Sequence, residues 1–177
     1  LADYFSFSNC ERLADIGSGA GFPGIPLKII YPHLRLTIVD SLNKRITFLK
    51  ELVDRLALDN VECIHGRAED LGREESYRDR FDLVTARAVA KLNTLVEICL
   101  PFVKPGGSFC SLKGTNLDEE IKGAEKSLFL LNGKVSHAVH FTLPEEGSQR
   151  HLVWIQKEGP TPKKFPRKAG VPFKKPL

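Results

Sequence analysis

Short apolar runs alternate with longer amphipathic segments along most of this chain of 177 residues. A short apolar run bounded by turn residues is typical of a buried strand, and a longer segment with helical spacing is typical of a helix that covers a sheet. The pattern predicts strands at 12–16, 35–40, 61–65, 81–86 and 108–113, with helices at 43–56, 92–100 and 118–131. This order predicts an α/β fold, a mostly parallel sheet with helices on both faces.

The end of the pattern departs from this alternation. Two β-like segments, about Lys134–Phe141 and His151–Lys157, are joined by the turn-rich stretch 144–148, and they predict a closing antiparallel hairpin. Five β-α units followed by such a hairpin are the order typical of Rossmann-like class I methyltransferases. Dinucleotide dehydrogenases normally keep their last strands parallel.

Length and composition limit the number of domains and the compartment. A chain of this length with 42% hydrophobic residues can bury one sizeable core but not two. No apolar run approaches the roughly 18 residues of a membrane span, and no signal-peptide pattern is present, so we expect a soluble cytoplasmic protein and a monomer. Because Leu1 comes first and the chain contains no methionine, we expect further N-terminal sequence to precede it.

The four cysteines do not form a metal-binding pattern. Cys10, Cys63, Cys99 and Cys110 are scattered, without a C-x-x-C pair. We expect them to be reduced and mostly buried, and we expect no metal.

The positive charge is concentrated at the C-terminal end. Residues 160–177 contain six basic residues and no acidic ones, which leaves 20 basic and 22 acidic residues in 1–159. Five prolines disfavour a regular helix there and favour an extended path. We therefore divide the chain into a domain, 1–159, and a basic, proline-rich tail, 160–177, which is either a solvated terminus, a segment that packs back on the domain, or a binding arm.

A glycine-rich segment, residues 15–24 (Asp-Ile-Gly-Ser-Gly-Ala-Gly-Phe-Pro-Gly), follows the first strand. Its alternate glycines let the backbone turn sharply and approach a ligand closely. The spacing Gly19-x-Gly21-x-x-Gly24 also fits the dinucleotide pattern, which is weak evidence by itself. In a nicotinamide fold the first glycine of that pattern follows the strand directly, but here Gly17 follows the strand and Gly19, the first glycine of the pattern, does not. With Asp15, the segment has the D-x-G-x-G-x-G form that methyltransferases use to receive the aminoacyl part of S-adenosylmethionine.

Acidic residues follow the next two strands. Asp40 ends the second strand, where a carboxylate can accept hydrogen bonds from both ribose hydroxyls. After the third strand comes 66–70, Gly-Arg-Ala-Glu-Asp, where methyltransferases hold the adenine; Glu69 or Asp70 could instead cap a helix. Because the carboxyl ends of these strands converge at one edge of the sheet, we expect one adenosine-type cofactor site.

The chain lacks the motifs of several methyltransferase classes, and this limits which group can accept the methyl. Adenine-N6 and guanine-N2 enzymes commonly carry an Asn/Asp-Pro-Pro-aromatic motif after the fourth strand, where this chain has Thr-Ala-Arg-Ala at 85–88. Cytosine-C5 enzymes need a thiolate, often after a proline, and no cysteine here follows a proline. Guanine N7 has a free lone pair and needs neither a general base nor a covalent step, so a site without an obvious catalytic dyad is compatible with it.

Four segments, 15–29, 39–45, 84–90 and 166–170, resemble the bacterial ribosomal RNA small-subunit methyltransferase G family, also called glucose-inhibited division protein B. The resemblance covers nearly the whole chain. It implies cytoplasmic N7 methylation of a guanine in the decoding region of 16S ribosomal RNA, and cofactor contacts at Gly17, Phe22, Ala68, Glu69 and Arg87. The family also has a helical N-terminal extension, which the sequence from Leu1 onward does not include.

Residue patterns and resemblance together give one set of candidate site residues. The predicted cofactor contacts are Asp15, Gly17, Gly19, Gly21, Phe22, Asp40, Ala68, Glu69 and Arg87. The predicted RNA contacts, to 16S ribosomal RNA or the small subunit, are Lys113, Lys163, Lys164, Arg167, Lys168, Lys174 and Lys175.

Arg87 is the one candidate for a catalytic role. Its guanidinium could hold the cofactor carboxylate, receive a phosphate or guanine O6, or be a solvated side chain at a helix start. For Lys44 and Arg45 a solvated helix face is favoured. The hypothesis for the tail is that its charges, with Phe165 and Phe173, clamp RNA.

Two rival functions stay open from the sequence alone. A nicotinamide-dependent oxidoreductase fits the incidental glycine spacing and Asp40, but it would need a substrate domain that this length does not supply. A non-catalytic RNA-binding module would have to explain why the whole glycine loop is intact.

Overall fold

The fold is taken from a computed structural model that describes residues 1–87, 89–114, 117–145 and 147–177. Residue 88 of the 84–90 segment and residue 146 of the predicted hairpin turn therefore lie outside the described residues.

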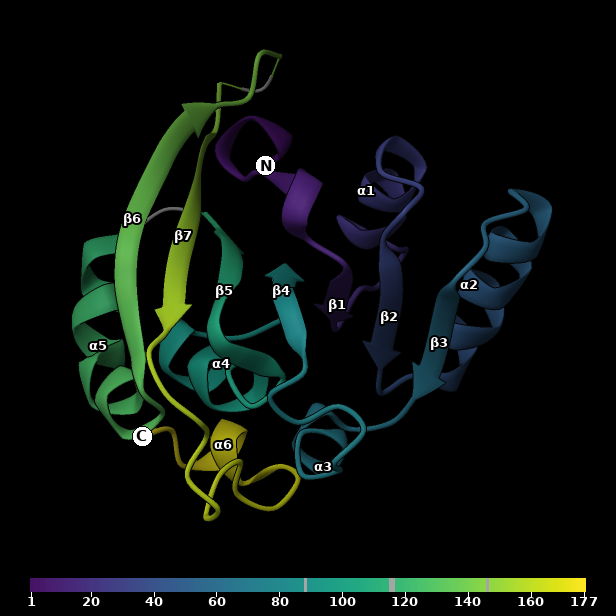
Figure 1. The fold of residues 1–177 in the computed structure, drawn as a ribbon. Coiled ribbons are helices and arrows are strands. Elements are labelled where there is room, and N and C mark those ends of the chain that lie inside the picture. The colour runs from purple at the N-terminus through teal and green to yellow at the C-terminus, as the bar shows by residue number, and fades with distance from the viewer. Residues whose placement is uncertain (88, 115–116, 146) are drawn as a thin grey trace.

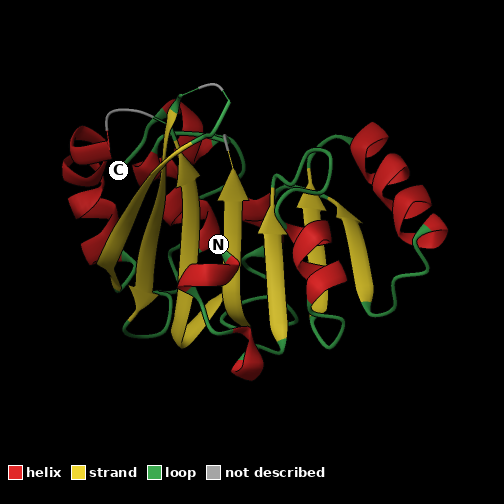
Figure 2. Ribbon diagram, turned by 90° about the horizontal axis from the view of Figure 1, so that it is seen from above, coloured by secondary structure: helices red, strands yellow, loops and turns green. Residues whose placement is uncertain are grey.

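One sheet organises the molecule, and over the described residues its strand order is β3-β2-β1-β4-β5-β7-β6 (Figure 1). The first five strands are parallel, β7 pairs antiparallel with both β5 and β6, and Figure 2 shows all of them side by side. The strands are β1 (Arg12–Ile16), β2 (Arg35–Asp40), β3 (Val61–His65), β4 (Phe81–Arg87), β5 (Val103–Lys113), β6 (Gly133–Thr142) and β7 (Gln149–Lys157). The predicted mostly parallel α/β sheet with a closing hairpin is confirmed.

Helices cover both faces of the sheet. One face carries α1, α2 and the N-terminal turns, whose apolar side chains share a core with Leu13, Leu36 and Trp154. The other face carries α4 and α5, packed over Val84, Phe109 and their neighbours. The elements are η1 (Ala2–Tyr4), η2 (Phe7–Asn9), α1 (Gly24–Ile30), α2 (Asn43–Arg55), α3 (Ala68–Leu71), α4 (Leu92–Cys99), α5 (Leu117–Leu130) and α6 (Val171–Lys174).

Some local features differ from the predictions. β5 begins at Val103, earlier than the predicted 108, and contains an irregularity, because Phe81 pairs with Val103 while Leu83 pairs with Ser108. The short turns η1 and η2 were not predicted. The four cysteines are free, and Cys10, Cys99 and Cys110 are buried.

The tail, 160–177, packs along the domain instead of extending into solvent. Phe165 is buried in the core with α4 and α5, with 4% of its surface exposed. The tail also contains one helical turn, α6, which the prolines were expected to prevent; Pro172 stands in its first turn, where a proline needs no hydrogen-bond partner for its nitrogen. The composition left three interpretations of the tail open. In the structure, the tail packs back on the domain.

The strongest charged contact of the tail is buried. Arg167 Nε and Nη2 donate to the two carboxylate oxygens of Glu97 at 2.8 and 2.5 Å, and the Arg167 backbone N–H donates to the same carboxylate at 2.9 Å. The Glu97 side chain lies on α4 and is 0% exposed. A buried carboxylate needs such a partner, because its own desolvation is costly.

We predict that Arg167→Ala lowers the free energy of unfolding by about 3–5 kcal/mol, because it leaves the buried Glu97 carboxylate unpaired. Urea denaturation of the full chain measures this, with Lys168→Ala, an exposed neighbour, as the matched control. Equal stability of the two variants would mean that the tail is not held by this pair.

Candidate functional site

The carboxyl ends of four parallel strands meet at the edge of the sheet where the strand order changes direction, between β1 and β4. Ligands bind at this position in open α/β sheets. Two neighbouring cavities open there, of about 220 and 570 Å³, and both touch Gly17 and Arg45. Together they lie in the size range of small-molecule sites, about 300–1,000 Å³.

The glycine loop after β1 is held by hydrogen bonds to the side chain of Asp15, a residue that is 0% exposed. One carboxylate oxygen of Asp15 accepts from Ser18 Oγ at 2.5 Å and from the Gly24 backbone N–H at 3.1 Å, and the other accepts from Thr85 Oγ1 at 2.9 Å. Burial raises the pKa of the Asp15 carboxyl, while the three hydrogen bonds oppose that shift. The carboxylate thus ties the loop to the start of α1 and to β4.

Two glycines of the loop are required for different reasons. Gly17 has φ +68°, and a Cβ on it would lie 2.6 Å from Val89 Cγ2, so a side chain fits neither the backbone nor the space. Gly19 has φ +64°, and a Cβ on it would meet nothing within 4 Å. The backbone at Gly19 therefore borders open space, as expected of a loop that cradles a ligand.

We call the smaller cavity the first cavity and the larger one the second cavity. Asp40, at the end of β2, forms part of the wall of the first cavity. The Asp40 carboxylate is 2% exposed and accepts hydrogen bonds from the backbone N–H groups of Gly19 and Leu42 at 3.1 and 2.9 Å. Arg45 Nη1 lies 3.2 Å from the same carboxylate. The cavity is lined by Ile16, Gly17, Val39, Asp40, Ser41, Arg45, Gly66, Arg67, Ala68, Glu69, Val89, Ile98 and Phe173.

The larger, second cavity extends from the glycine loop to the closing hairpin. It brings residues after β4 and β5 together with the facing ends of β6 and β7. The described residues lining it are Gly17, Ser18, Gly19, Arg45, Arg87, Leu112, Lys113, Gly114, Phe141, Leu143, Arg150, His151 and Leu152.

Charged groups in the second cavity differ in how they are held. Arg87 ends β4, is exposed, and has its guanidinium carbon 5.4 Å from the centre of the Phe22 ring. Lys113 is nearly buried, and its Nζ lies 2.6 Å from both Glu120 Oε2 and the Ala90 carbonyl oxygen. The positive charge of Lys113 is thus neutralised internally, whereas that of Arg87 faces the cavity.

His151 is the imidazole that lines the second cavity. Its Nδ1 lies 2.7 Å from Nδ1 of His140 on the neighbouring strand. Burial lowers the pKa of His151, and the charge of His140 lowers it further. A lowered pKa favours the neutral imidazole at neutral pH.

Sequence comparison gives the family. The model of rRNA small subunit methyltransferase G matches residues 1–153. Ribosomal RNA small subunit methyltransferase G of Brevibacillus brevis is 54% identical over 176 residues, which are 99% of this chain and 74% of that protein. The namesake from Lactobacillus acidophilus is 52% identical over 171 residues, 97% of this chain and 71% of that protein. The chain belongs to the rRNA small subunit methyltransferase G family.

The fold agrees with membership of the methyltransferase G family. A SAM dependent methyltransferase from Aquifex aeolicus superposes with a TM-score of 0.60 at 17% identity, over 82% of this chain and 81% of that chain. The protein is therefore an S-adenosylmethionine-dependent methyltransferase, as the glycine loop predicted. Neither an oxidoreductase nor a non-catalytic module is favoured.

The residues present suit S-adenosylmethionine. The first cavity combines a buried carboxylate, Asp40, with the loop 66–69 where an adenine would lie. The open side of Gly19 leads from it toward Arg87 in the second cavity. A nucleoside and an amino-acid carboxylate thus each have a complementary place.

The predicted cofactor residues of this methyltransferase G family member fall into three groups. Gly17, Asp40, Ala68 and Glu69 line the first cavity, and Gly17, Gly19 and Arg87 line the second. The third group lines neither cavity: Asp15 lies under the loop, Gly21 packs against Ile25 and Leu49, and Phe22 lies beside Arg87.

Arg45 is exposed, as a solvated helix face predicts, and it also lies 3.2 Å from Asp40 and borders both cavities. Sequence reasoning also missed Val89, Ile98, Phe141 and Phe173 as lining residues. These apolar side chains reach the site from separate elements, and no spacing in the sequence relates them.

The described part of the chain contains neither a membrane-spanning helix nor a cluster of metal-ligating side chains. None of its helices combines the length and apolar character needed to cross a membrane. Within that same part, His, Cys, Asp and Glu side chains do not gather into a group that could hold a metal ion.

We predict that Asp15→Ala lowers the free energy of unfolding by about 2 kcal/mol or more, because it leaves buried donors on Ser18, Gly24 and Thr85 without an acceptor. Urea denaturation measures the loss, and Asp3→Ala, an exposed acid, serves as the control. Full stability of Asp15→Ala would contradict its role in holding the loop.

Proposed function

We propose that this protein transfers the methyl group of S-adenosylmethionine to N7 of a guanine in 16S ribosomal RNA, in the decoding region. The curated relatives are named ribosomal RNA small subunit methyltransferases. The observation that carries the proposal is the pair of adjoining cavities around Gly17, because methyl transfer needs a donor site and an acceptor site in contact.

In this proposal the first cavity holds the adenosine part of the donor. The Asp40 carboxylate accepts hydrogen bonds from the ribose hydroxyls, which replace part of its contact with Arg45. The backbone at Ala68 and the side chain of Glu69 border the adenine. S-adenosylmethionine supplies a sulfonium methyl group, and the chain's own residues orient it toward the second cavity.

Arg87 is proposed to hold the carboxylate of the donor's amino-acid part. Its guanidinium faces the second cavity beside Gly17 and Gly19, and the Phe22 ring supports it at 5.4 Å. Arginine suits this task because its planar fork binds carboxylates through two parallel hydrogen bonds. The alternatives, a contact with phosphate or with guanine O6, would use the same face of the guanidinium.

The remainder of the second cavity is proposed to accept the target base. Phe141, partly exposed on β6, offers a ring on which an unpaired purine can stack, and Arg150 lies opposite it on β7. Guanine N7 needs no base to remove a proton, because its lone pair lies in the plane of the ring. Catalysis then consists of positioning the two reactants.

RNA contact along the tail is proposed for its exposed lysines, Lys163, Lys164, Lys168, Lys174 and Lys175. Arg167 and Lys113 are less suited to the RNA contact expected of them, because each is engaged by an internal carboxylate, Glu97 and Glu120.

Mapping of methylated positions on 16S ribosomal RNA tests the proposed reaction. RNA from cells that lack the protein is expected to be unmethylated at one guanine N7, and the purified protein with S-adenosylmethionine is expected to restore it. Naked RNA and isolated small subunits are each offered to the protein in parallel reactions, so that the preferred form of the substrate can be identified. An unchanged methylation pattern in the deletion strain would contradict the proposal.

We predict that Asp40→Ala weakens S-adenosylhomocysteine binding by about 1.5–3 kcal/mol, because it removes charge-assisted hydrogen bonds to the ribose. Isothermal titration calorimetry measures the change, and Asp54→Ala, an exposed acid on α2 that lines neither cavity, is the control. A folded Asp40→Ala protein with unchanged affinity would remove Asp40 from the donor site.

We predict that His151→Ala keeps most of the turnover, because attack by N7 needs no proton acceptor. Single-turnover methyl transfer to small subunits measures the rate, with thermal unfolding as a check on folding. General acid–base groups usually contribute about a hundredfold or more. A loss of that size at unchanged stability would reject the proposed mechanism in favour of one with a base at His151.

A further inference from the structure

We infer that the C-terminal tail is part of the donor site: its buried anchors hold Phe173 as the wall against which the adenine of the donor packs. The inference rests on the proposed use of the first cavity for the adenosine part. It gives the tail a role in cofactor binding in addition to the RNA-directed role that its charge suggested.

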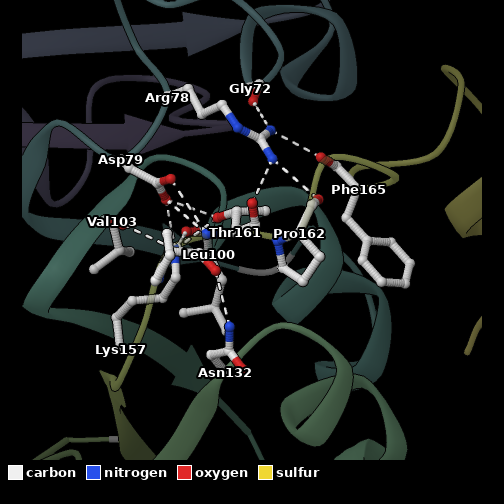
Figure 3. Close-up of polar contacts among 11 residues, drawn as sticks. Gly72, Arg78, Asp79, Leu100, Val103, Asn132, Lys157, Thr161, Pro162 and Phe165 are labelled. Carbon is white, nitrogen blue, oxygen red and sulfur yellow. Dashed lines mark hydrogen bonds and ion pairs between the residues drawn. The ribbon is translucent and has the colours of Figure 1, made fainter.

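The tail is anchored first at the amino ends of the strands, where β7 ends (Figure 3). Arg78 donates to the carbonyl oxygens of Thr161, Pro162 and Phe165 at 2.9, 3.1 and 2.8 Å, and to that of Gly72 at 2.9 Å. These contacts join the start of the tail to the loop that follows α3.

A second hydrogen-bond network fixes the same end. Lys157 Nζ, which is fully buried, lies 2.8 Å from Asp79 Oδ1 and 2.7 Å from Thr161 Oγ1. Thr161 Oγ1 in turn donates to Asp79 at 2.7 Å. The first residues of the tail are therefore held by two sets of polar contacts that meet at Thr161 (Figure 3).

From this end the tail runs along α4. Phe165 enters the core, and Arg167 pairs with the buried Glu97. One turn of α4 earlier, Thr94 Oγ1 donates to the Pro172 carbonyl oxygen at 3.3 Å. Figure 1 shows the result, with the yellow tail and α6 lying against α4 and beside α3.

The last anchor is at the donor cavity itself. The backbone N–H of Gly170 donates to Glu69 Oε1 at 2.8 Å, and the Glu69 side chain is 2% exposed. Gly170 has φ +82°, a backbone conformation that favours glycine, so a glycine suits the turn that the tail makes at this contact. Glu69, predicted from the sequence to contact adenine, thus also holds the tail.

Phe173 lies three residues beyond this anchor and lines the first cavity together with Ala68, Glu69 and Ile98. Its ring is 43% exposed, although the preceding Pro172 is buried. An aromatic side chain that directly follows the anchored Pro172 and is half-exposed at a nucleoside-sized cavity suits stacking or edge contact with a purine. The loop 66–68 lines the same cavity.

The test measures S-adenosylhomocysteine binding to the full chain by calorimetry. Phe173→Ala is expected to weaken binding about fivefold or more, the lower end of what one base–aromatic contact contributes, while Phe173→Tyr restores it. Phe129→Ala is the matched control, because Phe129 is 82% exposed on α5 and lines neither cavity. Thermal unfolding is recorded for each variant, and the Phe173→Ala midpoint is expected to stay close to that of the control.

A second measurement reports contact directly. Phe173→Trp places an indole at the cavity, in addition to the single native tryptophan, Trp154, which is buried. Its fluorescence is expected to change when S-adenosylhomocysteine is added, beyond the change seen in the wild type. Phe129→Trp is expected to show no extra change.

Two failures can be told apart by including Asp40→Ala in the same series. Unchanged affinity of Phe173→Ala, with a silent Phe173→Trp and a weakened Asp40→Ala, would overturn the role of the tail while leaving the donor site in place. Unchanged affinity of all three variants in a wild type that binds S-adenosylhomocysteine would overturn the donor site itself.

Discussion

The buried carboxylate of Asp15 is the constraint on which the site depends. It accepts hydrogen bonds from the glycine loop, from the first residue of α1 and from β4, so three elements that meet at the edge of the sheet are held in one arrangement. The approach at Gly24 is so close that a Cβ there would lie 2.9 Å from an Asp15 oxygen. With the loop fixed in this way, Gly17 lies between the first cavity and the larger second cavity that faces the hairpin.

Charge neutralisation inside the domain decides which groups remain available to ligands. Glu97, Glu120 and Asp79 are engaged by Arg167, Lys113 and Lys157. The buried member of each pair is Glu97, Lys113 or Lys157, and burial of such a charge is tolerable only because its partner is well placed. Arg87 is left facing the second cavity, and the exposed lysines of the tail are left at the surface. Two functions of the tail are thus compatible, one through its buried anchors and one through its outer charges.

Much of this organisation can be predicted from the sequence, since the apolar runs of β1, β2 and β3 are bounded by turn residues and have the predicted ends. The place of Asp40 in the site can also be predicted, because a carboxylate at the end of a strand is a local feature of the sequence. The role of Asp15 was only partly predictable: the motif marks it as important, but not that it fastens the loop instead of lining the pocket. The packing of the tail could not be predicted, because its partners are distant in the sequence. Glu97 lies 70 residues from Arg167, and Glu69 lies 101 residues from Gly170. The one local hint was Glu97 itself, a charged residue inside the apolar segment of α4.

A crystal structure of the protein with S-adenosylhomocysteine tests the central claim, that one donor site is built jointly from the strand ends and the tail. The account predicts the ribose on Asp40, the adenine between the loop 66–68 and Phe173, and the amino-acid carboxylate beside Arg87. Density for the nucleoside in the second cavity, or in the first cavity but away from Phe173, would contradict it.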